Sequence, residues 1–314
     1  MEVANRMVMK RQAAWLWKHL RIIVVSTLIV AFIAVAIVVI AMSFPQKQAA
    51  PRLSGLCFSP FLGENPRNAS SVKVLLDKVA PYTGGIRTFG STDEWAKIPA
   101  ITRRMDLYLA AGAGIYGDRN YDTKQVAGLV KLVKTGKVDL AVVGDETLMW
   151  NSLTEDELIS YIKQVKATGV TTTTSEHWEN LLSHPTVMQE VDVIVVNIYP
   201  FWEGVSVNDA IGYIDSIYRK VKARVGDKEV IVETGWPSAG KAEGKAATGP
   251  ENAARYLSDF TSWADSKGVR YFYFEAFDEP WKIKSEGSVG AHWGLWDKDG
   301  NMKQYARTIL NNKP

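Results

Sequence analysis

Two glutamates each follow a run of apolar, β-branched residues that is typical of a buried strand. Glu233 ends the run Val230-Ile231-Val232, after which Gly235-Trp236-Pro237 forces a turn, and Glu146 follows the run from Leu140 to Asp145. Burying a carboxylate without compensation is costly, so an acid at the end of such a strand indicates a function. Two carboxylates are what cleavage of a glycosidic bond requires. The pattern predicts a glycoside hydrolase.

More acids and aromatic rings follow the predicted strands. Besides Glu146 and Glu233, the acids at strand ends are Asp145, Glu176, Glu275, Asp278 and Glu279. Eight of the 11 tryptophans also come just after predicted strands: Trp95, Trp150, Trp178, Trp202, Trp236, Trp281, Trp293 and Trp296. Aromatic faces at one rim suggest a groove that stacks on sugar rings, although some of these rings will only pack loops against the fold.

Other chemistries lack their sequence signals. The segment from Gly112 to Gly117 matches a dinucleotide-binding pattern, but Asp118-Arg119-Asn120 separates it from the predicted helix that it should open. The four histidines have no HExxH spacing, and no serine has a Gly-x-Ser-x-Gly surround. We therefore expect no metal and no organic cofactor.

Strand-like and helix-like patterns alternate after the N-terminal region. Eight strands are predicted, at Ser54–Phe61, Gly85–Phe89, Asp106–Ala111, Asp139–Gly144, Gly169–Thr174, Val191–Ile198, Glu229–Glu233 and Arg270–Phe277. Helices are predicted at Ser70–Val79, Thr123–Val133, Glu155–Ala167, Val207–Val225, Pro250–Ser266 and Lys303–Leu310. Alternation of this kind predicts a (β/α)8 TIM barrel, whose active site lies at the carboxyl ends of the strands, with a doubly wound open sheet as the alternative.

The N-terminal region predicts a membrane anchor. Residues 22–42 carry no charge over 21 positions, which is long enough for a helix to cross a bilayer, and we place the transmembrane segment at 22–44. The tail 1–21 is basic and should stay in the cytoplasm, which puts the catalytic domain in the periplasm or outside the cell. The alternative is a signal peptide cleaved near Ala41-Met42-Ser43. Residues 45–52 are a predicted linker, and 53–312 the catalytic domain.

The charge of the chain belongs to this N-terminal region. The net charge is +3, but seven of the 37 basic residues and one of the 34 acidic ones lie in 1–52, so 30 basic residues face 33 acidic ones in the remainder. A net charge of about −3 gives no electrostatic attraction to the phosphates of nucleic acid, so we expect no nucleic-acid partner. Cys57 is the only cysteine, so no internal disulfide can form, and we expect it to pack in the core. The catalytic domain is expected to be a monomer.

Several motifs together resemble family 17 of the glycoside hydrolases, the retaining β-1,3-glucanases and related glucanosyltransferases. They are Ile86-Arg87-Thr88-Phe89-Gly90, Val143-Gly144-Asp145-Glu146, Val196-Asn197-Ile198-Tyr199-Pro200-Phe201, Glu233-Thr234-Gly235-Trp236-Pro237-Ser238, Phe277-Asp278-Glu279-Pro280-Trp281-Lys282 and Trp293-Gly294-Leu295. The resemblance covers roughly Leu53 to Leu310. It implies a β-1,3-glucan substrate.

The resemblance also implies roles for single residues. Glu233 would be the nucleophile, Glu146 the acid/base, and Tyr199 a partner of the nucleophile, while Glu279 and Lys282 would belong to the surrounding polar network. The full set of residues expected to bind substrate is Arg87, Asp145, Glu176, Tyr199, Phe201, Trp202, Trp236, Glu275, Asp278, Glu279, Lys282 and Trp293. A retaining mechanism would place the two catalytic carboxyl groups about 5 to 5.5 Å apart.

One position departs from the family pattern. The acid/base motif of the family reads Gly-Asn-Glu, and its asparagine can donate to the sugar 2-hydroxyl, whereas Asp145 stands there in this chain. An ionised carboxylate can only accept, and its charge should raise the pKa of Glu146. Three functions therefore remain open: a β-1,3-glucan hydrolase, a transglycosylase that remodels glucan at the membrane, and a carbohydrate-binding protein without catalysis.

Overall fold

The computed structural model of the chain describes residues 53–61 and 72–311. The predicted basic tail (1–21), membrane anchor (22–44) and linker (45–52) lie outside these described residues. Within the two described ranges, no helix is both long enough and apolar enough to cross a membrane.

Eight parallel strands close into a barrel, and each strand pairs with its neighbours in the sequence. Leu56 of the first strand lies opposite Tyr273 of the last, which closes the ring. The strands are β1 (Leu56–Cys57), β2 (Gly85–Arg87), β3 (Tyr108–Ala113), β4 (Leu140–Asp145), β5 (Thr172–His177), β6 (Ile194–Asn197), β7 (Val230–Thr234) and β8 (Tyr271–Tyr273). The predicted (β/α)8 barrel is confirmed, and the doubly wound open sheet is wrong.

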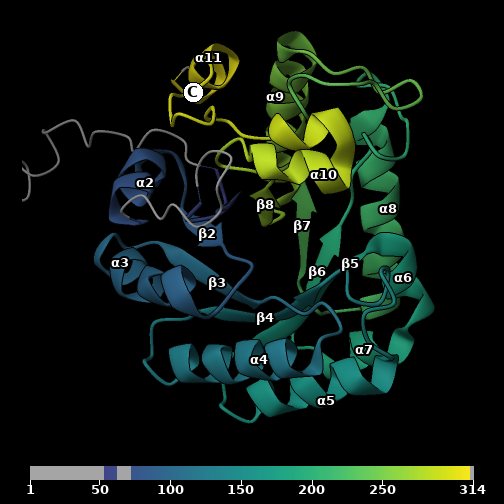
Figure 1. Cartoon of the computed structure of the whole chain (residues 1–314). Helices are drawn as coiled ribbons and strands as arrows, with labels where there is room; N and C mark the ends of the chain where they lie inside the picture. Colours follow the sequence, from purple (N-terminus) through teal and green to yellow (C-terminus); the bar gives the residue numbers. More distant parts are fainter. Residues whose placement is uncertain (1–52, 62–71, 312–314) are drawn as a thin grey trace, which may run out of the picture. The chain divides into compact units, whose positions relative to one another are not determined.

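Helices lie around the outside of the strands (Figure 1). They are α2 (Val72–Val79), α3 (Ile98–Arg104), α4 (Arg119–Val133), α5 (Glu155–Lys166), α6 (Trp178–Ser183), α7 (Pro185–Glu190), α8 (Ala210–Val225), α9 (Pro250–Lys267), α10 (Ile283–Glu286) and α11 (Gln304–Asn311). All the predicted helices are present over the described residues, and most of them have one end shifted by one to four residues. The predicted helix start at Ser70 lies outside the described residues. The sequence did not predict α3, α6, α7 and α10, which have four to seven residues and are too short to show a clear helical period.

Local capping explains where several helices begin and end. Helix α4 begins four residues before its predicted start because the Asp118 side chain accepts hydrogen bonds from the backbone of Asn120 and Tyr121. Thr154 and Glu157 form a reciprocal capping box at the start of α5. Helix α9 ends at Lys267, and its cap is Gly268, whose φ of 63° lies in the left-handed region that glycine tolerates best.

Side chains alternate between the inside of the barrel and the surrounding helices. Val142 and Ile231 belong to the cluster that fills the barrel, with Cys57, Ala110, Leu140, Val195 and Phe272. Their neighbours Val143 and Val232 pack in the other cluster, against the helices. Because the strand period is two, Glu233 must point inward, one layer above Ile231 at the carboxyl end. The barrel thereby fixes the direction of this acid.

Candidate active site

The last inward-facing layer of the barrel is polar. Glu233 pairs in register with Asn197 on the neighbouring strand, and the Ser175 hydroxyl donates to the Asn197 side-chain oxygen at 2.6 Å. On the other side of the ring, Cys57 pairs in register with Arg87. These side chains come from β1, β2, β5, β6 and β7, so the site is built by the closed barrel and not by one segment of sequence.

An irregularity in β4 directs Asp145 and Glu146 into this layer. The register between β4 and β5 shifts between Val142 and Asp145, as in a β-bulge. Gly144 has a φ of 80°, and a side chain there would clash with the Thr147 hydroxyl. Glu146 itself has a φ of 52°, which is unusual for a residue other than glycine. A strained backbone at an acid of this kind is typical of functional sites.

Two hydrogen-bond donors and one cation contact the Glu233 carboxylate, which is 1% exposed. The Tyr199 hydroxyl donates to Oε1 at 2.9 Å, and the Cys57 thiol donates to Oε2 at 3.1 Å. The Arg87 guanidinium forms an ion pair with Oε2 through Nη1. Burial raises the pKa of the Cys57 thiol well above its usual range, so the thiol keeps its proton and acts as a donor. Hydrogen bonds to the charged form of a carboxylate favour ionisation, as a nucleophile requires.

Glu146 has the opposite environment. Burial, and then the negative charge of Asp145, raise the pKa of its carboxyl group. The Asn197 amide donates to Glu146 Oε1 at 3.0 Å and to Asp145 Oδ1 at 3.2 Å, and so ties the two side chains together. A carboxyl group that keeps its proton to higher pH can serve as a general acid. The two glutamates therefore differ in the way that acid and nucleophile pairs differ.

Arg87 contacts both Glu233 and Asp145, the neighbour of Glu146. Its side chain is 1% exposed, and its Nη2 donates to Asp145 Oδ1 at 2.7 Å while Nη1 pairs with Glu233. Its guanidinium also lies over the Phe89 ring, 4.6 Å from the ring centroid. The side chain of Asp145 remains 37% exposed. Asp145 is thus a second counter-ion for a buried cation that also contacts the proposed nucleophile.

A buried charge network supports the loop that follows β8. Lys282 Nζ lies 2.7 Å from carboxylate oxygens of both Glu275 and Glu279, and all three side chains are 9% exposed or less. Burial raises the pKa of Glu275 well above its usual range, against the opposing charge of Lys282. Asp278 accepts from the Gly294 backbone N–H at 2.9 Å and pairs at 2.7 Å with Lys303, which directly precedes α11. These ion pairs connect the loop to itself and to Lys303, and contact of the three acids and Lys282 with sugar stays a prediction.

Four residues expected to bind sugar are packed inside the protein. Phe201, Trp236 and Glu176 are 0% exposed, and Trp293 is 1% exposed. The Trp236 indole donates to the Ala247 carbonyl, and one Glu176 oxygen accepts from the Leu148 backbone N–H in the loop that carries Glu146. Contact of these residues with sugar stays a prediction, because low exposure alone does not exclude it: Glu233, the predicted nucleophile, is only 1% exposed as well.

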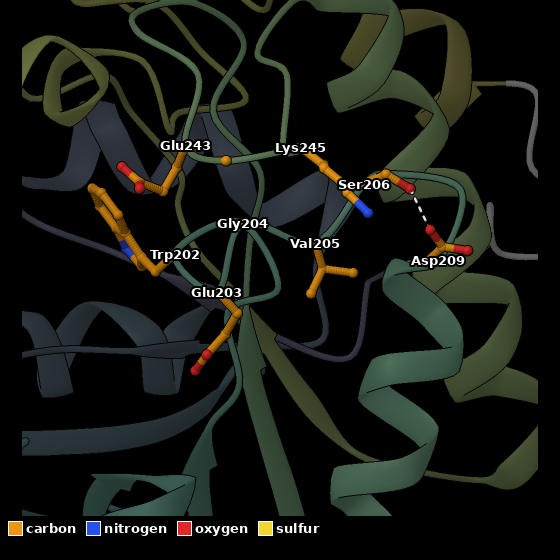
Figure 2. A pocket seen from close by; sticks show the side chains of 9 residues that line it. Trp202, Glu203, Gly204, Val205, Ser206, Asp209, Glu243 and Lys245 are labelled. Atoms are coloured by element: carbon orange, nitrogen blue, oxygen red, sulfur yellow. Dashed lines mark hydrogen bonds between the residues drawn. The ribbon is translucent and has the colours of Figure 1, made fainter.

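Trp202 does lie where a sugar could reach it. It is 43% exposed, and its ring centroid is 5.6 Å from that of Trp293, which in turn lies 5.7 Å from Tyr199 at the nucleophile. Figure 2 shows Trp202 and Glu243 at one end of an open groove and Lys245 at the other. The groove has a volume of about 610 Å³ and is lined by Trp202, Glu203, Gly204, Val205, Ser206, Asp209, Glu243, Gly244 and Lys245.

Two site residues were missed from the sequence. Cys57 was expected only to pack in the core, and its contact with Glu233 joins residues 176 positions apart. Asn197 lies in one of the motifs that carried the family resemblance, but no role was given to it. The signal available for Asn197 was its place at the end of a buried strand, where a polar side chain indicates function. For Cys57 the sequence offered no such signal.

The chain matches a family of glycoside hydrolases and is similar to several curated proteins. Residues 55–294 match the BtgE/BtgC glycoside hydrolase domain. The chain belongs to this family. It is 31% identical over 259 residues to a glucan 1,3-beta-glucosidase of Arthroderma benhamiae, which covers 76% of this chain and 84% of the relative. It is 28% identical to a probable glucan endo-1,3-beta-glucosidase, btgC, of Aspergillus fumigatus; that match covers 78% of this chain but only 40% of the longer relative.

Solved structures agree with this membership of the glycoside hydrolases. A glycoside hydrolase family 17 beta-1,3-glucanosyltransferase from Rhizomucor miehei superposes with a TM-score of 0.72 at 28% identity, over 81% of this chain and 96% of that enzyme. An active-site mutant of the same enzyme in complex with laminaritriose matches with the same TM-score at 27% identity. The chain is therefore a glycoside hydrolase or a transglycosylase of this kind.

Proposed function

We propose that this protein cleaves β-1,3-glucan with retention of configuration, through a covalent glycosyl-enzyme in which Glu233 is the nucleophile and Glu146 the acid/base. One observation carries the assignment of roles. Two hydrogen-bond donors and the Arg87 cation surround the Glu233 carboxylate, an environment that favours the charged form, whereas burial and the Asp145 charge favour the protonated form of Glu146. Two carboxyl groups whose environments separate their protonation states are the arrangement that this chemistry uses.

The reaction then proceeds in two steps. A Glu233 oxygen attacks the anomeric carbon, the bond from that carbon to the leaving oxygen breaks, and Glu146 gives its proton to this oxygen. Tyr199 and Arg87 keep the attacking carboxylate in place. In the second step the Glu146 carboxylate takes a proton from an incoming hydroxyl, whose oxygen displaces Glu233 from the anomeric carbon. Water as the acceptor gives hydrolysis, and a sugar hydroxyl gives transfer.

The β-1,3 linkage of the substrate is inferred from the relatives, which are named as glucan 1,3-beta-glucosidases. The groove beside Trp202 supports an oligosaccharide substrate, because its exposed indole, which contacts Trp293 and through it Tyr199, can stack on a sugar ring; neither Glu146 nor Glu233 lines this groove. Transfer is the second candidate function. It is favoured by the R. miehei glucanosyltransferase, 96% of which is covered by this chain.

Incubation of residues 53–314 with laminari-oligosaccharides, followed by separation of the products, tests the proposed function. Shorter sugars indicate hydrolysis, and longer or branched sugars indicate transfer. Unchanged sugars that are nevertheless retained on the protein would indicate a binding protein and contradict both enzymatic functions. A Glu233→Gln variant is the control, because it keeps the shape of the side chain and loses the nucleophile.

We further propose that residues 22–44 anchor the protein in a membrane, with 1–21 in the cytoplasm and a monomeric catalytic domain on the periplasmic or extracellular side. The support is the charge-free run from Ile22 to Met42 and the basic residues before it. Full-length protein should stay in the membrane fraction after an alkaline wash, and protease added outside intact cells should reach the catalytic domain. Release of a shortened protein would indicate cleavage near Ala41-Met42-Ser43.

A further inference from the structure

One buried cation serves two carboxylates in this site. Arg87 is 1% exposed and pairs with Glu233 through Nη1 and with Asp145 through Nη2. A buried charge that loses its partner is strongly destabilised. The energy of the site therefore depends on how many counter-ions Arg87 retains at each stage of the reaction.

The two steps of the proposed reaction move charge within the site, and the inference below rests on that proposed function. When a Glu233 oxygen bonds to the anomeric carbon, the carboxylate becomes a neutral ester. Glu146 has then given its proton to the leaving oxygen, and it carries the negative charge instead. Arg87 keeps its place at the end of β2 but now faces an ester on one side. Its remaining anionic partner is Asp145, at 2.7 Å.

We propose that Asp145 stabilises the covalent glycosyl-enzyme by acting as the counter-ion of Arg87 while Glu233 is esterified, so that breakdown of this intermediate is the slow step. Asp145 acts through Arg87 and is a positioning residue in this respect. The asparagine that the family resemblance places here would leave Arg87 between an ester and a neutral amide. The free enzyme would lose less stability from that change, because the ionised Glu233 still serves as a counter-ion of Arg87.

A second contact works in the same direction. The Asn197 amide holds Asp145 and Glu146 side by side, at 3.2 Å and 3.0 Å from its nitrogen. Once Glu146 has become a carboxylate, it stands beside a like charge, which increases its affinity for a proton. A Glu146 that regains a proton from solvent cannot take one from the acceptor hydroxyl. Breakdown of the glycosyl-enzyme is slower as a result.

A long-lived intermediate has a consequence for the choice of acceptor. The leaving sugar has time to depart, and a second glucan chain has time to enter the groove beside Trp202. Transfer requires both events before water reacts. Asp145 thus favours transfer over hydrolysis whenever acceptor sugar is abundant.

The test is a pre-steady-state measurement on residues 53–314 with an aryl β-laminaribioside that releases a coloured phenol on glycosylation. Wild type should release a burst approaching one phenol per active site, followed by slower turnover. Asp145→Asn should accelerate the second step on the order of tenfold and largely remove the burst. The readout is the ratio of the rate constants for formation and breakdown of the intermediate. Asparagine also gains a donor for the sugar 2-hydroxyl, but this donor acts in both steps and changes the ratio little.

Asp156→Asn is the matched control, since it makes the same change at an exposed position in the first turn of α5 and should leave the burst intact. Asp145→Ser is a second neutral variant, used if Asp145→Asn does not fold. Phenol release by wild type without a burst, or an equal burst in a neutral variant, would overturn the proposal while leaving the glycosidase function in place. No phenol release at all by the wild type would instead overturn the proposed function on which this inference rests.

Discussion

Replacement of Glu176 by glutamine should make the protein more stable at pH 8 and change its stability by only about 1 kcal/mol near pH 5. Glu176 is 0% exposed, and burial raises the pKa of its carboxyl group to about 8. One oxygen accepts from the Leu148 backbone N–H at 2.9 Å, and the other has no hydrogen-bond partner among the described residues. Glutamine keeps the acceptor for Leu148 and never ionises.

The size and sign follow from proton linkage. In the unfolded chain a glutamate releases its proton near pH 4.3, whereas folded Glu176 keeps it to about pH 8. Between these values the folded state binds one proton more than the unfolded state, so stability falls as the pH rises. One pKa unit corresponds to about 1.4 kcal/mol, which gives a loss of roughly 2 to 4 kcal/mol by pH 8 for wild type and none from this residue in Glu176→Gln.

Urea denaturation of both proteins at pH 5 and pH 8, followed by tryptophan fluorescence, measures this difference. The two proteins share all other titrating groups. The free energy of unfolding of the variant minus that of wild type should therefore change between pH 5 and pH 8 only through Glu176. A difference that stays constant from pH 5 to pH 8 would refute the reasoning. The Michaelis constant for a laminari-oligosaccharide should stay within about twofold of the wild-type value, because Glu176 holds a loop through Leu148. A tenfold rise would instead support the predicted contact of Glu176 with sugar.

Three further changes test other parts of the site. Tyr199→Phe removes a donor from the nucleophile Glu233 and should lower kcat by about 10- to 100-fold and the free energy of unfolding by about 1 to 3 kcal/mol, as steady-state kinetics and urea denaturation would show. Lys282→Met leaves two buried carboxylates unpaired and should lower the free energy of unfolding by about 3 kcal/mol or more in urea titrations. Asp145→Asn removes a charge that raises the pKa of Glu146, so the alkaline limb of kcat/KM should move to lower pH; an unmoved limb would show that burial alone sets this pKa.

The sequence predicted the fold well because the barrel strands carry a simple signal. Runs such as Val230–Val232 are apolar over their whole length, as strands buried on both faces must be, and helices with good caps separate them. Strand ends were less predictable. The first strand was expected over Ser54–Phe61 but pairs only over Leu56–Cys57, because pairing ends where the backbone turns into a loop, and no residue pattern marks that point.

Pairwise contacts within the site could not be read from the sequence. The Arg87 contact with Asp145 joins β2 to β4, and it depends on a bulge in β4 that turns Asp145 inward. The exposure of single tryptophans could not be predicted from the sequence either. Trp202 and Trp236 both follow strands, yet one is 43% exposed and the other is buried, because loop packing decides which ring faces the groove.

Covalent trapping tests the central claim most directly. Residues 53–314 would be incubated with a 2-deoxy-2-fluoro-β-laminaribiosyl fluoride, whose fluorine slows breakdown of the glycosyl-enzyme, and the digested protein analysed by mass spectrometry. The mechanism predicts one adduct, on the peptide that contains Glu233, and its loss in Glu233→Gln. An adduct on another carboxylate, or continued turnover of laminari-oligosaccharides by a protein that never forms an adduct, would contradict the assignment of Glu233 as the nucleophile.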